Sequence, residues 1–362
     1  MKRYRLLALM IACMLLVPLA LGETVTLVDD AEREVTLVTH PRRAIILDIL
    51  PLPSVLTVFL GSAESIVAME PASMAAARNG ILGELYPEVL SVSTDIMAGD
   101  DVNLEALLAL APDVVYYNAS NKALREQLDN AGLPAVAISP SRWGYDCIET
   151  YDRWIDLLSK IYPGTGLPAE VSAYSRSMAQ TIAERTASIP EGERRRVLFL
   201  FQYGDHARVT SGKSFFGQWW CDATGSVNVA EEISADNKNA AFTMEQVYAW
   251  DPEVILITNF TTAQPEDLYA NAIGGDDWSA VDAVKNRRVY KMPLGTYRSY
   301  TPGVDTPITL EWLSLLLYPD LFPEFDLARD VRAYYESLYG IQLTDAQIEA
   351  MLHPSSAASA YQ

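Results

Sequence analysis

Arginine, tyrosine, tryptophan and amide side chains gather in the segments that follow the apolar, β-branched runs of this sequence. The residues that we expect to contact a ligand are Asn118, Arg142, Trp143, Tyr203, His206, Arg208, Lys213, Asn259, Tyr297, Arg298 and Tyr300. Guanidinium groups pair with carboxylate, catecholate or oxyanion oxygens, and aromatic rings cover flat surfaces. The set therefore suits a bulky anionic or aromatic ligand. Arg142 and Arg298 are expected to supply the positive charges that bind it.

Each of these residues also has a purely structural interpretation. Either arginine could brace its own loop against a carboxylate, and the segment around Arg208 and Lys213 could face away from a ligand. The tyrosines could stack on a chelate, bind iron through phenolate or simply close a cleft. His206 could be a solvated loop histidine rather than a ligand.

Several other kinds of site are disfavoured by particular residues. Ser211 to Ser214 imitates the end of a phosphate-binding loop, but Ala207 stands where the first glycine of that motif belongs. The only histidines are His40, His206 and His353, too scattered to predict the histidine cluster of a zinc carrier. Neither Gly-x-Ser-x-Gly nor His-Glu-x-x-His occurs. We therefore predict no catalytic residues, no metal site and no cofactor, with a secreted enzyme with a cleft active site as the alternative.

The elements that must position these residues are repeated in two halves of the chain. The segment Asn103 to Val115 is echoed by Thr243 to Ile255, and in each copy a capping residue and a first-turn acid precede an apolar helix, a proline and a β-branched run. Each copy predicts one αβ unit. The sequence therefore indicates the duplication of a whole lobe.

Apolar runs alternate with segments long enough for crossover helices, which predicts an α/β fold with mainly parallel sheets. The predicted strands are Ala44–Leu47, Ser65–Met69, Asp113–Tyr117 and Ala135–Ser139 in the first half, and Arg196–Phe201, Val227–Ala230, Val254–Thr258 and Arg288–Met292 in the second. A hairpin of Val25–Val28 and Glu34–Val38 precedes them. Ligands of such sheets bind beyond the carboxyl ends of the strands, where the residues above lie.

One long amphipathic segment, Pro168 to Ile189, lies between the halves and contains no internal glycine or proline. We expect it to hold the lobes at a nearly fixed spacing, so that closure is small. The predicted boundaries are a signal peptide at 1–22, a first lobe at 23–162, the connecting helix at 163–190, a second lobe at 191–325, C-terminal helices at 326–354 and a disordered tail at 355–362.

Composition limits the compartment and the partners. A basic start, an apolar run from Leu6 to Leu21 and small residues up to Gly22 predict a secretory signal, with an uncleaved membrane anchor as the alternative. Its removal leaves 24 basic and 47 acidic residues, a formal charge of −23, which disfavours nucleic acid as a partner. We expect Cys147 and Cys221 to be buried free thiols, Cys13 not to be lipidated, and the protein to be a monomer.

Several short motifs, in this order and spacing, resemble one known family. They are the Asn103 to Val115 unit, Thr210 to Lys213, Asn228 to Ala230, Trp278, Ala283 to Asn286, Arg288 to Tyr290 and Glu311 to Leu313. They are similar to the helical-backbone periplasmic binding proteins, which serve ABC importers of iron-siderophore, haem and cobalamin, with molybdate and tungstate binders among them. The resemblance implies two Rossmann-like lobes joined by a single long helix, a ligand in the cleft and no catalysis.

The resemblance also implies one exposed glutamate per lobe that docks on the ABC permease. Glu88 stands at the expected place in the first lobe. In the second lobe Val227 stands just before Asn228 where the family has its glutamate, and Glu231 or Glu232 is the expected substitute. We therefore expect an extracytoplasmic protein that captures an iron(III) chelate or related metal complex and delivers it to a permease, with an oxyanion, haem or a corrinoid as alternative ligands.

Overall fold

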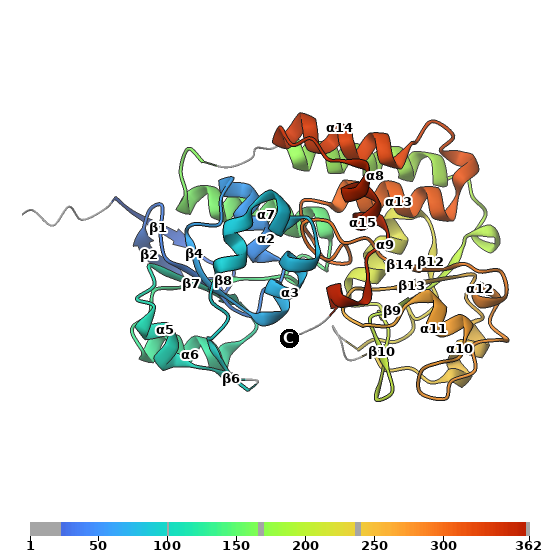
Figure 1. Ribbon diagram of the computed structural model, residues 1–362, viewed down its shortest axis with the longest axis horizontal. Coiled ribbons are helices and arrows are strands. Elements are labelled where there is room, and N and C mark those ends of the chain that lie inside the picture. Colours follow the sequence, from blue (N-terminus) through green and yellow to red (C-terminus); the bar gives the residue numbers. More distant parts are fainter. Residues whose placement is uncertain (1–22, 100, 166–169, 236–239, 360–362) are drawn as a thin grey trace, which may run out of the picture.

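The computed structural model describes residues 23–99, 101–165, 170–235 and 240–359. The expected signal peptide and Pro168 lie outside these residues. The chain forms two α/β lobes that stand side by side in Figure 1, with helices α8, α13 and α14 running along one edge. Among the described residues, no helix is both long and apolar enough to cross a bilayer.

The first lobe is built on a four-stranded parallel sheet of order β4-β3-β7-β8. Its strands are β3 (Ala44–Ile46), β4 (Ile66–Met69), β7 (Val114–Asn118) and β8 (Ala135–Ile138). The predicted hairpin is confirmed as β1 (Thr24–Val28) and β2 (Glu34–Val38), which pair antiparallel. The lobe also contains α2 (Leu52–Leu60), α3 (Pro71–Asn79), α4 (Leu82–Leu85), η1 (Pro87–Ser91), β5 (Met97–Ala98), β6 (Asp101–Val102), α5 (Leu104–Ala109), α6 (Lys122–Asn130) and α7 (Cys147–Ile161).

The second lobe repeats this arrangement in a four-stranded parallel sheet of order β12-β9-β13-β14. Its strands are β9 (Arg196–Leu200), β12 (Val227–Asn228), β13 (Val254–Ile257) and β14 (Val289–Lys291). The lobe also contains η2 (Glu191–Glu193), β10 (Gln202–Gly204), β11 (Ala207–Val209), α9 (Phe216–Thr224), α10 (Met244–Trp250), α11 (Pro265–Tyr269) and α12 (Asp282–Lys285). The two sheets have the same strand order, so the structure confirms the duplicated α/β architecture.

The repeated sequence unit has the same local structure in both copies. The Asn103 side chain accepts a hydrogen bond from the Ala106 amide at 3.1 Å and begins α5, and Thr243 begins α10 in a capping box. Both copies then turn through a left-handed residue directly before the proline, Ala111 at φ 43° and Asp251 at φ 40°. The duplication therefore extends to backbone conformations that side-chain-bearing residues rarely adopt.

Helix α8 (Glu170–Thr186) connects the lobes and is anchored in both hydrophobic cores. Val171, near its start, is buried in the core of the first lobe, and Ile182 is buried in the core of the second. The helix packs against α7, α9 and α13 (Thr306–Leu317). A helix with one end in each core can act as a strut, which is the role predicted for this segment.

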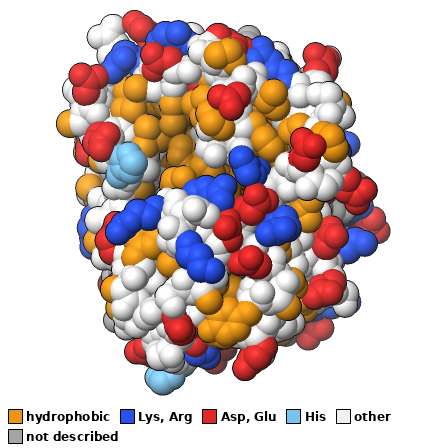
Figure 2. Space-filling model, turned by 90° about the vertical axis from the view of Figure 1, so that its right-hand side faces the viewer, with side chains coloured by type: hydrophobic (Ala, Val, Ile, Leu, Met, Phe, Trp, Pro, Cys, Tyr) orange, Lys and Arg blue, Asp and Glu red, His pale blue; other side chains and the backbone are white. Residues whose placement is uncertain are grey.

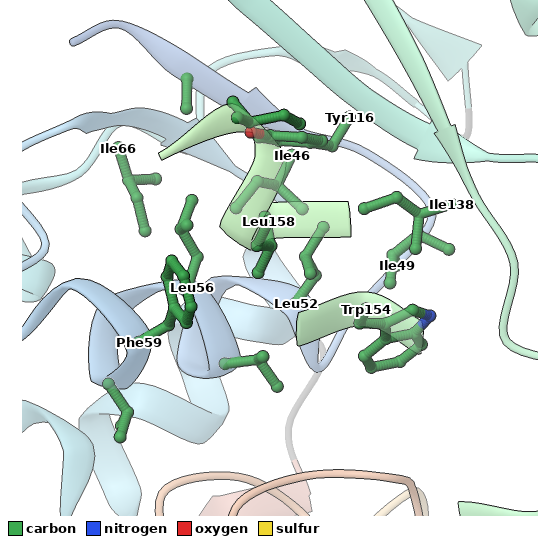
Figure 3. Packing of buried hydrophobic residues seen from close by; sticks show 14 of the residues in the cluster. Ile46, Ile49, Leu52, Leu56, Phe59, Ile66, Tyr116, Ile138, Trp154 and Leu158 are labelled. Carbon is green, nitrogen blue, oxygen red and sulfur yellow. The ribbon is translucent and has the colours of Figure 1, made fainter. Parts of the chain in front are cut away.

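The first-lobe core lies between the sheet and two helices. In Figure 3, Leu52, Leu56 and Phe59 of α2 and Trp154 and Leu158 of α7 lie on one side of the sheet residues Ile46 and Tyr116. Cys147 and Cys221 are buried and free, as predicted.

The C-terminal segment returns to the first lobe. Helix α14 (Leu327–Tyr339) ends at Gly340, whose φ of 66° suits glycine, and α15 (Asp345–Leu352) begins in a capping box at Thr344. They follow η4 (Pro319–Leu321). The predicted disordered tail is wrong for Ser356–Ser359, which form the short 3₁₀ helix η5 against α3. The small side chains there allow close packing on the alanines of α3, and Ser359 is buried.

Candidate ligand-binding site

A cavity of about 280 Å³ lies between the lobes. Its lining residues are Asp48, Ile49, Leu50, Pro51, Asn118, Pro140, Phe201, Phe215, Phe216, Phe260, Thr301 and Pro302. Asp48, Asn118 and Pro140 lie at or just beyond the ends of β3, β7 and β8, and Phe201 and Phe260 beyond the ends of β9 and β13. The cavity is therefore at the carboxyl ends of both parallel sheets, where this architecture binds ligands.

The second lobe contributes a wall of four phenylalanines. Phe201 lies with its ring centroid 4.9 Å from that of Phe260 and 4.8 Å from that of Phe215, which in turn lies 5.5 Å from Phe216. Such centroid separations are typical of favourable aromatic packing. The rings therefore form a connected apolar surface that a flat ligand could cover.

Tyr300 supports this wall from behind. Its ring centroid is 5.3 Å from that of Phe215 and 5.4 Å from that of Phe201, and its hydroxyl donates to Ser211 Oγ at 2.7 Å. Burial raises the pKa of Tyr300 well above its ordinary value. Tyr300 therefore acts as a buried support for the rings, and its fully buried side chain does not suit the predicted contact with a ligand.

Arg298 also lies behind the phenylalanine wall. Its guanidinium carbon is 4.7 Å from the centroid of Phe260 and 5.6 Å from that of Tyr297, and the side chain is 1% exposed. Tyr297 and Arg298 were predicted to contact the ligand, but neither belongs to the lining, which contains the Phe260 ring instead. The guanidinium can act on a ligand through its field rather than through a direct hydrogen bond.

The first lobe contributes the polar part of the cavity. Asp48 has a left-handed backbone, with φ 58°, and its carboxylate accepts a hydrogen bond from the Asn121 amide. The Asp48 backbone N–H donates to the carboxylate of Glu70. Burial, followed by the neighbouring Asp48 carboxylate, raises the pKa of Glu70. Asn118, which was predicted as a site residue, lines the cavity and accepts two hydrogen bonds from Ser120.

Arg142 and Trp143 lie away from the cavity lining. The Arg142 guanidinium donates to the Asp30 carbonyl at 2.6 Å and forms a 2.7 Å ion pair with Glu32. Trp143 packs against the hydrophobic core of the first lobe. The loop after β8 turns towards the β1–β2 hairpin, so the expectation that Arg142 supplies ligand charge is not supported by its position.

Four further predicted residues belong to the β10–β11 region and stay outside the lining. Arg208 forms a bidentate pair with Asp276 at 2.7 and 2.6 Å, and the Tyr203 hydroxyl donates to the same carboxylate at 2.9 Å. His206 and Lys213 are exposed. Asp276 thus binds the Arg208 guanidinium and the Tyr203 hydroxyl, both of which were predicted to bind a ligand. The structure therefore favours a structural role for these two side chains.

Asn259 is buried directly before Phe260. Its amide donates to the carbonyls of Met292 and Pro293, at 2.8 and 3.0 Å. It therefore fixes the segment after β13 against the segment after β14. Asn259 positions the Phe260 ring and does not itself line the cavity.

The lobes touch directly beside the cavity. Tyr145 of the first lobe lies with its ring centroid 5.7 Å from Phe215 and 5.2 Å from Phe216. The Ile81 amide donates to the Gly295 carbonyl at 3.1 Å, and a Cβ on Gly80 would lie 2.5 Å from the same carbonyl oxygen. This close approach of the two backbones requires glycine at position 80.

The predicted docking glutamates differ in their surroundings. Glu88 accepts hydrogen bonds from the Ser62 hydroxyl and the Ala63 amide, which lower its pKa although partial burial opposes them. Glu231 and Glu232 are exposed, and Glu232 accepts a hydrogen bond from the Trp250 indole. Figure 2, which faces the second lobe, shows acidic and basic side chains interspersed around a hydrophobic area. The docking roles stay predictions.

Sequence reasoning missed the four phenylalanines and Asp48. Phe201 is the last residue of the predicted strand Arg196–Phe201, and Phe260 lies two residues beyond the predicted strand Val254–Thr258, so their position at a strand end was the signal that could have identified them. No such signal exists for Phe215 and Phe216, which reach the cavity only through the β10–β11 hairpin and the start of α9.

A comparison with known families matches residues 17–294 to the model described as periplasmic binding protein. The chain belongs to this family. A relative in Haemophilus influenzae, the molybdate-binding protein MolA, is 27% identical over 359 residues, which cover 92% of this chain and 97% of MolA. Periplasmic binding proteins of this kind act outside the cytoplasm, where they deliver a ligand to an ABC permease.

Solved structures of the periplasmic binding protein family share the fold. A periplasmic solute-binding protein from Veillonella parvula has a TM-score of 0.77 and 27% identity, covering 91% of this chain and 97% of that one. Helicobacter pylori CeuE, solved with a nickel–histidine complex, has a TM-score of 0.69 and 21% identity, covering 91% and 99%. The two-lobe architecture predicted from the sequence is therefore confirmed.

Proposed function

We propose that this protein captures a metal complex of an organic ligand, with an iron(III) chelate as the first candidate, in the cavity between its lobes and delivers it to an ABC permease. The observation that carries the proposal is the wall of four phenylalanines in the cavity at the carboxyl ends of the two sheets. Apolar surface removed from water contributes roughly 25 cal/mol per Å², so these rings favour a ligand with organic surface. A volume of about 280 Å³ suits a compact chelate better than a complete macrocycle.

A bare molybdate or tungstate ion is the second candidate, because the relative MolA is a molybdate-binding protein. An oxyanion is held by a shell of hydrogen-bond donors or cationic groups. Among the described lining residues, the side chains that could donate are those of Asn118 and Thr301. The Thr301 hydroxyl already donates to the Arg298 carbonyl at 3.1 Å. This scarcity of side-chain donors is the reason for placing the oxyanion second.

The experiment is a titration of the purified protein without residues 1–22, followed by intrinsic tryptophan fluorescence and calorimetry. The ligands are ferric catecholate and hydroxamate chelates, haem, a corrinoid, molybdate and tungstate. We expect a ferric chelate to bind stoichiometrically and to be recovered unchanged, which also distinguishes a carrier from an enzyme. Binding of molybdate or tungstate alone would favour the second candidate, and no response to any of these ligands would refute the proposal.

Phe260→Ala tests whether the cavity is the site. Loss of the ring should weaken chelate binding about tenfold or more, because a buried phenylalanine contributes roughly 1.5–3 kcal/mol. The matched control is Tyr248→Ala, which removes an exposed ring from the same lobe. An equal effect of both variants would place the site elsewhere.

A further inference from the structure

The two walls of the cavity differ in charge as well as in shape. Of the described residues that line it, Asp48 alone has a carboxyl or basic side chain. Asn118 and Thr301 add neutral polar groups, and the remaining lining is aliphatic, proline or aromatic. A ligand that fills the cavity therefore meets a carboxylate on one side and phenylalanine rings on the other.

The Asp48 carboxylate is held at this wall from two directions. The Asn121 amide donates to it, and the Asp48 backbone N–H is tied to Glu70, which follows the neighbouring strand β4. The left-handed backbone at φ 58° is a strained conformation for a residue with a side chain, and Asp tolerates it better than most. Asp48 is thus fixed at the cavity wall, with the Glu70 carboxyl close behind it.

Aromatic rings and carboxylates both stabilise positive charge. The electron-rich face of an aromatic ring attracts a cation by about 0.5–2 kcal/mol, and a carboxylate attracts it directly. An anion in the same place would be repelled by Asp48 and would lack a cationic partner in the described lining. The composition of the walls therefore favours a cation.

Two basic side chains of the second lobe oppose the binding of a cation, but neither lines the cavity. Arg298 lies behind the Phe260 ring, with its guanidinium carbon 4.7 Å from the ring centroid. Lys291 is buried, and its Nζ donates to the carbonyls of Thr261 and Ala263 at 2.6 and 2.9 Å. Their fields should be strongest at the Phe260 end of the cavity, so the cationic part of a ligand belongs at the Asp48 end.

We propose that the ligand carries a cationic group that binds Asp48, while its organic surface covers the phenylalanine wall. This inference rests on the proposed function and narrows it to chelates, or other organic molecules, with an ammonium, guanidinium or other positively charged group. It replaces the anionic ligand expected from Arg142 and Arg298. The inference assigns Asp48 as the residue that selects for charge.

The test uses three small probes of similar shape, measured by calorimetry and ligand-observed NMR. They are phenyltrimethylammonium as the cation, tert-butylbenzene as its neutral isostere and benzenesulfonate as the anion. We expect the wild-type protein to bind the cation about tenfold more tightly than the neutral probe and to bind the anion most weakly. Equal affinities, preference for the anion, or no binding of the cation would overturn the inference.

Asp48→Asn removes the charge while keeping the size, the hydrogen-bond acceptor for Asn121 and the tolerance of a left-handed backbone. It should reduce the preference for the cation to the part that the phenylalanine rings contribute, without changing the affinity for tert-butylbenzene. The matched control is Asp95→Asn, which neutralises an exposed carboxylate of the same lobe and should change nothing. An unchanged preference in Asp48→Asn would overturn the inference.

The same proteins separate this inference from the proposed function. If a ferric chelate binds and its affinity is lowered by Phe260→Ala but not by Asp48→Asn, the cavity is the site and the charge selection is refuted. If phenyltrimethylammonium binds through Asp48 and no metal complex binds, the charge selection holds for another organic cation and the metal-complex function is refuted.

Discussion

The two lobes share one strand order yet place different chemistry at equivalent strand ends. Strands β3 and β7 of the first lobe lead to Asp48 and Asn118, and their counterparts β9 and β13 lead to Phe201 and Phe260. The repeat therefore conserves the positions of the strand ends while their side chains are polar in one lobe and aromatic in the other. A duplicated scaffold thus provides a cavity with two unlike walls, each of which can recognise a different part of a ligand.

The lobes are more alike in how they hold these walls. Each has a fully buried tryptophan whose indole N–H donates to a backbone carbonyl next to the cavity: Trp154 to Ser139 in the first lobe and Trp220 to Tyr300 in the second, both at 2.9 Å. Ser139 precedes Pro140 of the lining, and Tyr300 precedes Thr301. The supports are equivalent even though the surfaces they carry are not.

Replacing either tryptophan should produce the largest effect. Trp154→Ala and Trp220→Ala should each lower the free energy of unfolding by about 3–5 kcal/mol, because a large cavity forms in a packed core. The matched Trp→Phe variants, which mainly lose the hydrogen bond, should lose about 1–2 kcal/mol. Chemical denaturation measures both.

The same experiment tests how far the lobes are independent. Because α8 is anchored in both cores, we expect each variant to shift a single transition of the whole protein. Two separate transitions, with only one of them shifted, would contradict this expectation and show that each lobe unfolds alone.

The lobes should also differ in their response to pH. Burial raises the pKa of Asp30 in the first lobe to about 6, and burial followed by the Asp330 carboxylate raises the pKa of Glu311, on α13, to about 8. A group whose pKa is raised by folding contributes stability that is complete below its pKa in the unfolded chain. This stability is lost as the pH rises through its pKa in the folded protein. The contribution of Asp30 should therefore be lost near pH 6, while that of Glu311 continues to fall towards pH 8.

Between pH 6 and 7 we expect the free energy of unfolding to fall by about 1 kcal/mol, and Glu311→Gln should remove this slope. Burial, followed by the charge of Arg298, lowers the pKa of Lys291 to about 7. Lys291 therefore makes the free energy of unfolding rise with pH, but mainly above pH 7. Urea denaturation at several pH values measures the slope. Asp30→Asn is the control, since it should act only at lower pH; a slope retained in Glu311→Gln would assign it to another group.

The smallest effects concern the two arginines first expected at the site. Arg142→Ala should change ligand affinity by less than about twofold, because it removes an exposed ion pair of small energy. Arg298→Met removes the guanidinium behind Phe260 and should strengthen phenyltrimethylammonium binding by about threefold. Calorimetry measures both, and a severe loss in Arg142→Ala would return that residue to the site.

The sequence predicted the framework well because its signals are local. The β-branched runs identified the eight strands of the two sheets, and the capping residues Asn103 and Thr243 identified the repeated helices. The C-terminal helices were predicted by the same means. The tail was not, because the short helix at Ser356–Ser359 depends on its contact with α3 rather than on its own sequence.

The site could be predicted only in part, because the direction of a loop side chain depends on the whole fold. Asn118 ends a predicted strand and lines the cavity, whereas Arg142 follows the next strand and turns to Glu32 on the hairpin. Arginines and tyrosines were chosen for their chemistry, but Asp276 engages Arg208 and Tyr203. The residues that do form the wall are phenylalanines, which sequence reasoning usually assigns to a core.

The return of the chain to the first lobe has a mechanical consequence. The lobes are joined by α8 and again where α15 and η5 meet the first lobe: Gln347 donates to Glu84 at 2.7 Å, and η5 packs on α3. A rigid body held at two separate points keeps one degree of freedom, rotation about the line through them. With both attachments intact, the cavity should admit its ligand by a hinge rotation of one lobe about this axis rather than by translation of the lobes away from each other.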